Sequence, residues 1–328
     1  MQGWHAPTIS PYRNLSLDPA CSVFHYGLGA FEGMKAYRDS RGRVRLFRPE
    51  LNMARMGRSM ARLALGPALD EAGYLACLAR FAAVEKGWIP EGDGYSLYLR
   101  PTVIGTQPTL GVGPSRSLKL FTIATPVGPY FPEGFKPLSI YAESAAVRAW
   151  PGGCGDTKLG GNYAPTILVQ RAAAAKGYAQ VLWLFGPNLN VTEVGTMNLF
   201  VLWRRPGDGA LELLTAPLDG TILPGVTRDS IISLARGWGE FAVTERAFTM
   251  HELKEALEAG RVVEMFGAGT AAVVSPIKGV HFLGKDYAVP LDPGNASAGA
   301  GKATQRFWKE LLDIQYGRKE HPWSVVVG

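Results

Sequence analysis

The sequence predicts a mixed α/β protein with two domains. Its 328 residues are enough for two domains, or for one large one, with a substantial core. Stretches with helical periodicity alternate with short apolar stretches that are typical of strands. Residues 128–137, rich in glycine, proline and aromatic side chains, interrupt this alternation. We therefore expect a small N-terminal α/β domain over 1–127, an inter-domain loop over 128–137 and a larger domain over 138–328.

The first domain should contain both strands and helices. Residues 43–48 predict a strand, and Pro49 should open a helix that continues to 65, because proline fits the first helical position. Asp70 is a candidate cap for a second helix that ends at Gly87. The apolar runs 96–105 and 117–127 predict two further strands.

The second domain should begin with a strand over 137–143. A helix over 164–177 and a β-hairpin over 179–203, turning at 186–190, should follow. The remaining pattern predicts, in order, a strand over 210–217, a helix over 227–239, a strand over 240–248, a helix over 250–260, two strands around a bend within 261–277, a loop over 292–301 and a helix over 303–317.

Composition excludes several classes of protein. The formal net charge is +6, but the basic residues do not cluster, so the charge is only a weak hint at anionic ligands. The cysteines Cys21, Cys77 and Cys154 form no CxxC pair, which favours a reducing intracellular compartment and argues against a structural zinc or other metal site. No apolar run is long enough to span a membrane, and no secretory signal is present.

Several residue patterns point to chemistry. Lys158 lies among glycines in GDTKLGGNYAPT, and Tyr163 follows it. A partly buried Glu193, at the end of an apolar strand, would need a cationic partner, although an exposed hairpin carboxylate is the commoner case. The segment LPGVTRDS places the backbone N–H groups of Val226 and Thr227 at a helix start, where they favour a phosphate. The bend FGAGTA around Thr270 could add further donors.

A lysine, a carboxylate, a phosphate cradle and a tyrosine together suggest pyridoxal 5'-phosphate. In such a site the lysine forms a Schiff base, the carboxylate keeps the pyridine nitrogen protonated, and the cradle holds the phosphate. On the strand SLYLRP, Tyr98 and Arg100 share one face, and an arginine that faces inward there requires an anion. The GxG of TLGVGP lies in no strand–loop–helix unit and does not indicate a dinucleotide site.

Eight ordered segments extend these patterns: HYGLGAFEGMKAY, RLFRPELNMARM, SLYLRP, KLGGNYAPT, QVLWLFGP, TEVGTMN, ILPGV and EMFGAGTA. In this order they resemble the branched-chain aminotransferases, a group of fold-type IV pyridoxal-phosphate enzymes, and in particular their eukaryotic-type branch. The resemblance runs from about Trp4 to the C-terminal ELLDIQYGRKEHPW. It implies the two-domain fold of the D-amino-acid-aminotransferase-like enzymes and makes Lys158 the Schiff-base lysine.

The resemblance also implies roles for other positions. It implies that the cofactor phosphate is bound by Arg55, by the backbone of Val226 and Thr227 and by Thr270. Tyr163 would contact the phenolic oxygen of the cofactor and Glu193 its pyridine nitrogen. Thr196 would add a further contact with the cofactor. The residues implied for the substrate pocket are Tyr26, Phe31, Tyr98, Thr196 and Ala271, with Arg100 receiving the distal carboxylate of glutamate or 2-oxoglutarate. Tyr130 would lie in the inter-domain loop, and Leu110 and Val112 would reach across a dimer interface. For Phe31, Leu110 and Val112, ordinary packing is a serious alternative.

Two features depart from the family pattern. Where some animal members carry a CxxC pair beyond the GT bend, this chain has Ala272 and Ser275. The chain also starts where family members already have a few dozen residues behind them, so we expect a small domain that is truncated at its start.

The resulting functional prediction is a homodimeric enzyme that transfers amino groups between L-leucine, L-isoleucine or L-valine and 2-oxoglutarate. Small-molecule amino acids and 2-oxo acids would be its partners, with no nucleic acid and no membrane, in the cytoplasm or the mitochondrial matrix. The alternatives are another fold-type IV enzyme, such as a D-amino-acid aminotransferase or aminodeoxychorismate lyase, and a non-catalytic binding protein on the same fold. The Arg100 strand and EVGTMN argue against the first, and the combination of Lys158, Tyr163 and Glu193 argues against the second.

Overall fold

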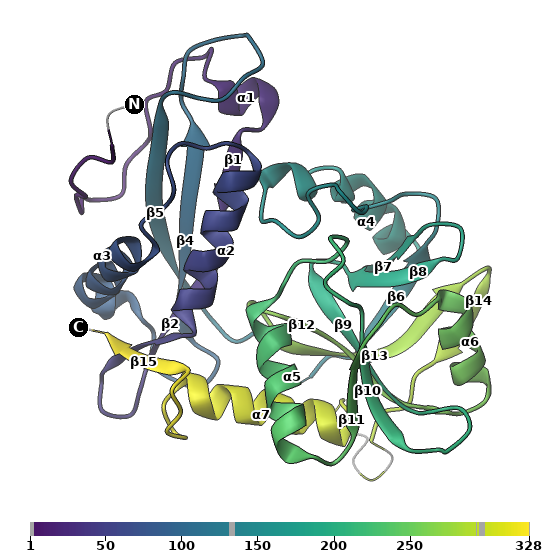
Figure 1. Cartoon of the computed structure of the whole chain (residues 1–328). Coiled ribbons are helices and arrows are strands. Elements are labelled where there is room, and N and C mark those ends of the chain that lie inside the picture. The colour runs from purple at the N-terminus through teal and green to yellow at the C-terminus, as the bar shows by residue number, and fades with distance from the viewer. Residues whose placement is uncertain (1–2, 131–134, 293, 295–298, 328) are drawn as a thin grey trace. The chain divides into compact units, whose positions relative to one another are not determined.

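The computed structural model describes residues 3–130, 135–292, 294 and 299–327. Figure 1 presents the chain, whose contacts divide it into two compact units. The first unit comprises Met1–Pro129, Thr157–Gly161 and Leu312–Gly328, and the second comprises Tyr130–Asp156 and Asn162–Leu311. These units differ from the contiguous domains expected from the sequence. The lysine segment and the last residues of the chain belong to the first unit, because they make their contacts there.

The first unit is built on a six-stranded sheet in the order β1-β4-β2-β3-β15, with β5 paired to β4, and every pairing is antiparallel. Its elements are α1 (Ser22–Tyr26), β1 (Gly29–Phe31), β2 (Met34–Arg38), β3 (Val44–Phe47), α2 (Pro49–Arg62), α3 (Glu71–Val84), the 3-10 helix η1 (Glu85–Trp88), β4 (Ser96–Gly105), β5 (Leu118–Val127) and β15 (Ser324–Val327).

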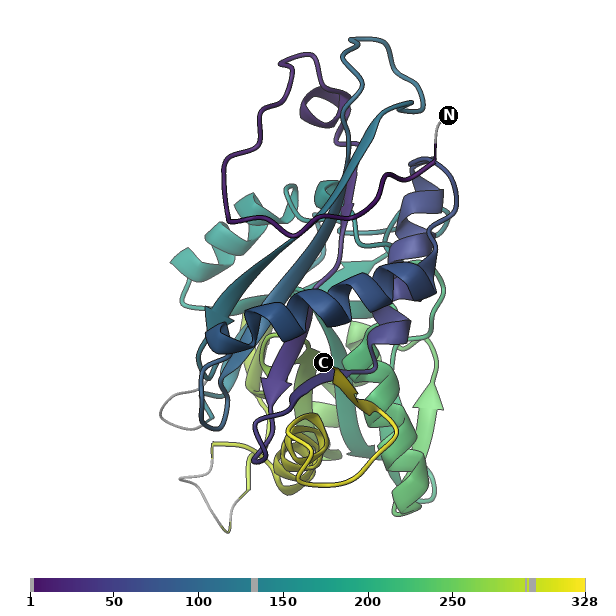
Figure 2. The same ribbon diagram turned by 90° about the vertical axis from the view of Figure 1, so that its left-hand side faces the viewer.

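The helices α2 and α3 pack on this sheet. Met53 of α2 and Leu78 and Ala82 of α3 join Leu97 and Leu99 of β4 in one buried cluster. Figure 2 shows α3, in blue, lying across the long strands. The expected helix starts are confirmed: Pro49 is the first residue of α2, and the Asp70 side chain accepts a hydrogen bond from the backbone N–H of Gly73 at the start of α3.

The short elements of the first unit were not expected from the sequence. The segment HYGLGAFEGMKAYR, for which no element was predicted, contains the end of α1 and the strands β1 and β2. The strand β15 pairs with β3, so that Val325 lies opposite Leu46. This pairing is the reason that the C-terminal segment belongs to the first unit.

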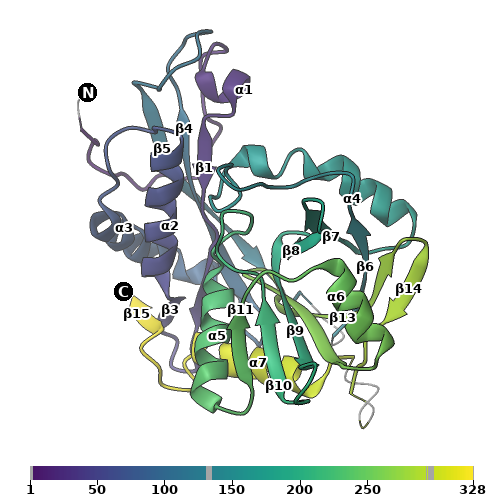
Figure 3. The ribbon, with the colours of Figure 1, turned by 45° about the vertical axis from the view of Figure 1, so that its right-hand side comes forward.

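The second unit contains a nine-stranded sheet that closes on itself. Its strand order is β11-β10-β9-β12-β13-β6-β7-β8, with β14 paired to β13, and β8 also pairs with β9. The six strands from β9 through β12, β13, β6 and β7 to β8 therefore form a closed ring (Figure 3). The strands are β6 (Leu138–Glu143), β7 (Gln180–Phe185), β8 (Asn190–Val194), β9 (Met197–Arg204), β10 (Leu211–Thr215), β11 (Ala242–Glu245), β12 (Val262–Gly269), β13 (Val273–Phe282) and β14 (Lys285–Ala288).

The strands of this ring share a buried apolar cluster. Buried side chains from successive strands, among them Leu182, Leu199, Trp203, Met265 and Ile277, form one cluster. The helices of the unit are the 3-10 helix η2 (Gly160–Asn162), α4 (Thr166–Ala175), α5 (Val226–Trp238), α6 (Met250–Glu258) and α7 (Lys302–Gln315). The first two residues of η2 and the last residues of α7 belong to the first unit. A closed ring leaves few open strand edges, which gives rigid positions to the loops that it carries.

One expectation for this unit is wrong. Residues 179–203 were expected to form a single hairpin, but they form three strands, because a second turn follows at Gly195 and Thr196. Gly195 has φ +58°, a left-handed conformation that glycine adopts without a Cβ penalty. The turn separates Glu193 on β8 from Asn198 on β9 and places them opposite each other.

Parts of two expected segments lie outside the described residues, namely 131–134 in the inter-domain loop and 293 and 295–298 in the loop over 292–301. Within the part of the chain that the structure describes, no helix combines the length and the apolar character that crossing a membrane requires.

Candidate active site

Lys158 belongs to the first unit, where its backbone is held against β1. Its N–H donates to Ser59 Oγ at 2.9 Å, and its carbonyl accepts from the N–H of Phe31 at 3.0 Å. The next residue, Leu159, forms a bridge with Ala30. The Nζ of Lys158 lies 4.9 Å from the centre of the Phe31 ring. The lysine is therefore fixed at its backbone and set over an aromatic face.

A buried ion pair lies in the same unit. Arg55 donates from Nε to Glu32 Oε1 at 2.7 Å and from Nη2 to Glu32 Oε2 at 2.9 Å, and Asn52 Nδ2 donates to Oε2 at 2.8 Å. Burial alone would raise the pKa of Glu32, but the charges of Arg55 and Lys158 and the hydrogen bonds from Arg55 and Asn52 hold that pKa below its usual value. Glu32 is thus an ionised partner for two cations.

Arg100 contacts the same aromatic ring, Phe31, as Lys158 does. Its guanidinium carbon is 4.7 Å from the centre of the Phe31 ring, and its Nη2 donates to the hydroxyl oxygen of Tyr98 at 2.8 Å. Among the residues that the structure describes, the buried Nε of Arg100 has no hydrogen-bond partner. An unsatisfied buried donor on a cation is costly, so this position fits an anionic ligand.

The remaining pocket residues expected in the first unit lie together near α1. The hydroxyl of Tyr26 donates to the carbonyl of Leu110. Leu110 and Val112 are highly exposed for apolar side chains, at 66% and 85%. Packing within the chain therefore does not account for these two residues.

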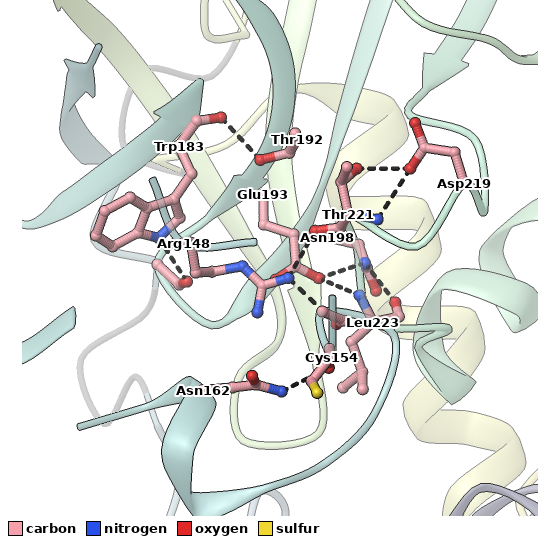
Figure 4. A network of polar contacts seen from close by, with 12 residues as sticks. Arg148, Cys154, Asn162, Trp183, Thr192, Glu193, Asn198, Asp219, Thr221 and Leu223 are labelled. Atoms are coloured by element: carbon pink, nitrogen blue, oxygen red, sulfur yellow. Dashed lines mark hydrogen bonds and ion pairs between the residues drawn. The ribbon is translucent and has the colours of Figure 1, made fainter. Parts of the chain in front are cut away.

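In the second unit, Glu193 is buried at the end of β8 and is the centre of a polar network (Figure 4). Its Oε1 accepts from the backbone N–H of Leu223 at 2.8 Å and from Asn198 Nδ2 at 3.1 Å. Its Oε2 lies 3.0 Å from Nη2 of Arg148. The cationic partner that a buried Glu193 would need is thus present, and it is Arg148.

The start of α5 adjoins this network. Asn198 Nδ2 also donates to the carbonyl of Leu223, and a Cβ on Gly225 would collide with Oδ1 of the same asparagine. Gly225 is the N-cap residue of α5, and no described side chain caps the helix. The first N–H groups of α5, at Val226 and Thr227, therefore keep the character of an anion site, and only glycine fits before them.

The bend between β12 and β13 carries Thr270 and Ala271. Ala268 of β12 pairs with Asn198 of β9, so the bend and Glu193 belong to the same end of the ring. The bend ends in a strained turn, because the N–H of Val274 donates to the carbonyl of Ala272 around Val273, whose φ is +62°. A β-branched residue rarely adopts this conformation, and such strain is common at ligand sites.

The other expected residues of the second unit have simpler surroundings. Thr196 is exposed in the turn after β8. The carbonyl of Tyr163 accepts hydrogen bonds from Thr166 N–H and Oγ1 at the start of α4, and Tyr130 is 53% exposed. Their contacts with the cofactor or substrate stay predictions. Among the described residues, no group of His, Cys, Asp and Glu has a metal-binding arrangement.

These two sets of residues can be compared with known proteins. The profile of the family described as amino-transferase class IV matches residues 29–280. The chain belongs to the class IV aminotransferases. The branched-chain-amino-acid aminotransferase of Monosiga brevicollis is 57% identical over 326 residues, covering 99% of this chain and 82% of that protein. The mitochondrial branched-chain-amino-acid aminotransferase of Bos taurus is 52% identical over 328 residues, covering 99% and 81%.

Solved structures share the fold of this aminotransferase. The branched-chain aminotransferase of Thermoproteus uzoniensis, determined with norvaline, superposes with a TM-score of 0.75 at 25% identity, covering 95% of this chain and 94% of the other. The prediction of a fold-type IV α/β architecture is confirmed.

Sequence reasoning missed four residues of the aminotransferase's two polar networks: Glu32, Asn52, Arg148 and Asn198. Asn52 precedes Arg55 by three positions on α2, so a shared helix face could have indicated it. Asn198 lies in the segment TEVGTMN, beyond a turn that was not foreseen. Arg148 stands alone in its sequence context, and no spacing pattern could have paired it with Glu193.

Proposed function

We propose that this aminotransferase transfers the amino group of L-leucine, L-isoleucine or L-valine to 2-oxoglutarate, with pyridoxal 5'-phosphate as its cofactor. The observation that carries the proposal is Lys158, whose backbone is pinned by Ser59 and Phe31 and whose Nζ lies over the Phe31 ring. The high identity to relatives named branched-chain-amino-acid aminotransferases supports the substrate class.

The donor set fits this cofactor. A phosphate requires cations and N–H donors, which Arg55, the uncapped start of α5 and Thr270 offer. A protonated pyridine nitrogen requires an ionised acceptor, which Glu193 offers. When bound, the cofactor supplies an aldehyde for the substrate's amino group and a ring that takes up electrons.

Each of the expected site residues would then have its own role in the reaction. Lys158 would hold the aldehyde through its Nζ and, once released, would serve as the base that moves the proton at the substrate Cα. Glu193 would keep a proton on the pyridine nitrogen. Tyr163 would donate to the phenolic oxygen, and Thr196 and Ala271 would line the substrate pocket.

Substrate choice would follow from an apolar pocket with one cation. Tyr26, Phe31 and Tyr98 provide aromatic walls, and each buried CH₂ contributes about 0.8 kcal/mol, so leucine and isoleucine should react better than valine, and alanine poorly. Arg100, with its unsatisfied Nε, should receive the distal carboxylate of glutamate and 2-oxoglutarate. Arg100→Met should therefore spare the half-reaction with leucine and impair the one with glutamate.

The functional form would be a homodimer inside the cell, in the cytosol or the mitochondrial matrix. The exposed Leu110 and Val112 support a dimer, because a partner subunit would cover them and gain two apolar contacts for its substrate pocket. The name of the Bos taurus relative and a sequence without a CxxC pair support an intracellular location.

The test is the reaction of the purified protein loaded with pyridoxal 5'-phosphate. We expect a visible absorption band that shifts on addition of L-leucine, and glutamate formation with 2-oxoglutarate. Lys158→Ala should lose both the band and turnover. A faster half-reaction with D-alanine than with L-leucine would favour a D-amino-acid aminotransferase, and an absent band would favour a binding protein.

A further inference from the structure

Arg148 is a buried cation that connects three segments of the second unit. Its side chain is 8% exposed, and its Nη2 lies 3.0 Å from Glu193 Oε2. The same nitrogen donates to the carbonyl of Thr221 at 2.7 Å and to that of Gly155 at 3.3 Å. Figure 4 shows the guanidinium pointing toward the Glu193 carboxylate. A guanidinium at this depth is costly unless it is paired, so its placement beside Glu193 requires an explanation.

The other donors to Glu193 described above are neutral, since they are the backbone N–H of Leu223 and the amide of Asn198. They fix the orientation of the carboxylate and, as hydrogen bonds to its charged form, also favour ionisation, but they bring no net charge. Arg148 brings a full positive charge to the second oxygen, and a cation at this distance favours the ionised carboxylate. If Glu193 took up a proton, Arg148 would lose its buried counter-charge.

We propose that Arg148 is a positioning residue for the reaction: it keeps Glu193 ionised, so that the proton between this carboxylate and the cofactor stays on the pyridine nitrogen. The inference rests on the proposed function. It adds a residue that acts through Glu193, and it makes the electron-accepting capacity of the cofactor depend on Arg148.

The chain offers a matched control in Arg228. This arginine is also buried, with a side chain 3% exposed, and its Nη2 lies 2.8 Å from Glu245 Oε2. Like Arg148, it has a buried Nε with no hydrogen-bond partner among the described residues, and it donates to a backbone carbonyl, that of Ala216. Its carboxylate partner has no expected role at the cofactor. Loss of either arginine should therefore destabilise the fold, and only loss of Arg148 should alter the cofactor.

The experiment uses the holoenzyme loaded with pyridoxal 5'-phosphate that carries ¹⁵N at the pyridine position. The nitrogen resonance, followed against pH, reports whether this atom holds a proton. In Arg148→Gln we expect the ratio of nitrogen-bound to carboxylate-bound proton at neutral pH to fall at least tenfold, because the carboxylate that has lost its counter-charge competes better for the shared proton. Arg148→Lys, which keeps the charge, should stay within about threefold of wild type, and Arg228→Gln should match wild type.

Each outcome of this experiment supports or overturns the proposed role of Arg148. A wild-type pH profile in Arg148→Gln overturns the inference, as does an equal shift in Arg228→Gln, which would mean a general effect of lost stability. If Arg148→Gln does not fold, Arg148→Met, which fills the space with an apolar chain, replaces it under the same criterion. A wild-type protein that binds no cofactor would overturn the proposed function itself, whereas a normal wild type with an unaffected variant overturns only the role of Arg148.

Discussion

In each unit, one of the residues expected at the cofactor belongs to a buried arginine–glutamate pair, and the two pairs have opposite polarity. In the first unit, Arg55 is the residue expected to meet the cofactor, and Glu32 supports it from behind. In the second unit, Glu193 is expected to meet the cofactor and Arg148 supports it. A phosphate is an anion and a protonated pyridine is a cation, so Arg55 has the charge that suits the first group and Glu193 the charge that suits the second.

The comparison shows how a protein can present a charge in a buried site. A single buried ion is strongly disfavoured, whereas an ion with a partner behind it is fixed in place and keeps its charge. The supporting members also differ in their surroundings, since Glu32 has Asn52 and the charge of Lys158 nearby, and Arg148 has two backbone carbonyls.

The largest expected effect is that of Glu193→Gln, which removes the charge that faces the pyridine nitrogen. The amide keeps the shape of the side chain, so the fold should remain. We expect kcat to fall about a thousandfold, equivalent to about 4 kcal/mol of transition-state stabilisation. Steady-state kinetics with leucine measure it. A kcat within a few-fold of wild type would mean that the second pair serves only the fold.

Glu32→Gln should act mainly on stability, because it leaves Arg55 buried with a weakened partner. We expect the apoprotein to lose about 3 kcal/mol of unfolding free energy in urea. Inorganic phosphate should restore part of this loss, since it would supply a counter-charge to Arg55. Asp39→Asn is the control, because Asp39 accepts from Arg43 and Arg45 in the same unit and is no part of the site. Equal rescue of both variants by phosphate would contradict the assignment of Arg55.

Lys35 on β2 extends the comparison to a cation whose pKa is shifted mainly by desolvation. Burial lowers the pKa of Lys35 from 10.5 to about 8. Between these values the unfolded chain holds a proton that the folded chain has released, so this group makes stability rise with pH. Lys35→Met should therefore be about 2 kcal/mol more stable than wild type at neutral pH.

That advantage should disappear as the pH passes 10.5. Urea unfolding of both proteins across this pH range gives the difference directly. A difference that does not change with pH would show that packing, and not the charge, is responsible.

The smallest expected effect is at a turn that belongs to neither pair. Leu283 and Gly284 connect β13 and β14, and both have positive φ, at +48° and +78°. A two-residue turn of this kind favours Asn-Gly, and Leu283 is 76% exposed, so Leu283→Asn should gain about 1 kcal/mol without loss of buried surface. Thermal unfolding measures the gain, and kcat should not change. A changed kcat would show that stability alone alters turnover. The kcat changes predicted for variants of the two arginine–glutamate pairs would then no longer indicate a role at the cofactor.

The sequence was informative where one local signal was enough. Pro49 and Asp70 start the helices that they were expected to start, and Lys158 and Glu193 stand in segments whose composition singles them out. The sequence did not predict features that depend on contacts between distant segments. Nothing in the residues around Arg148 announces Glu193, and β15 becomes a strand only because β3 offers it an edge. The second turn at Gly195 was hidden because the apolar residues continue on both sides of it.

The closed ring of the second unit also has a consequence for the rate at which this unit folds. The strand β6, at Leu138–Glu143, pairs in parallel with both β13, at Val273–Phe282, and β7. The ring therefore cannot close until segments from nearly the two ends of the unit have met, and such a search through a long loop is slow. Partly folded chains would carry open strand edges during this interval and would be most prone to associate with one another. Dilute refolding conditions should consequently raise the yield of native protein.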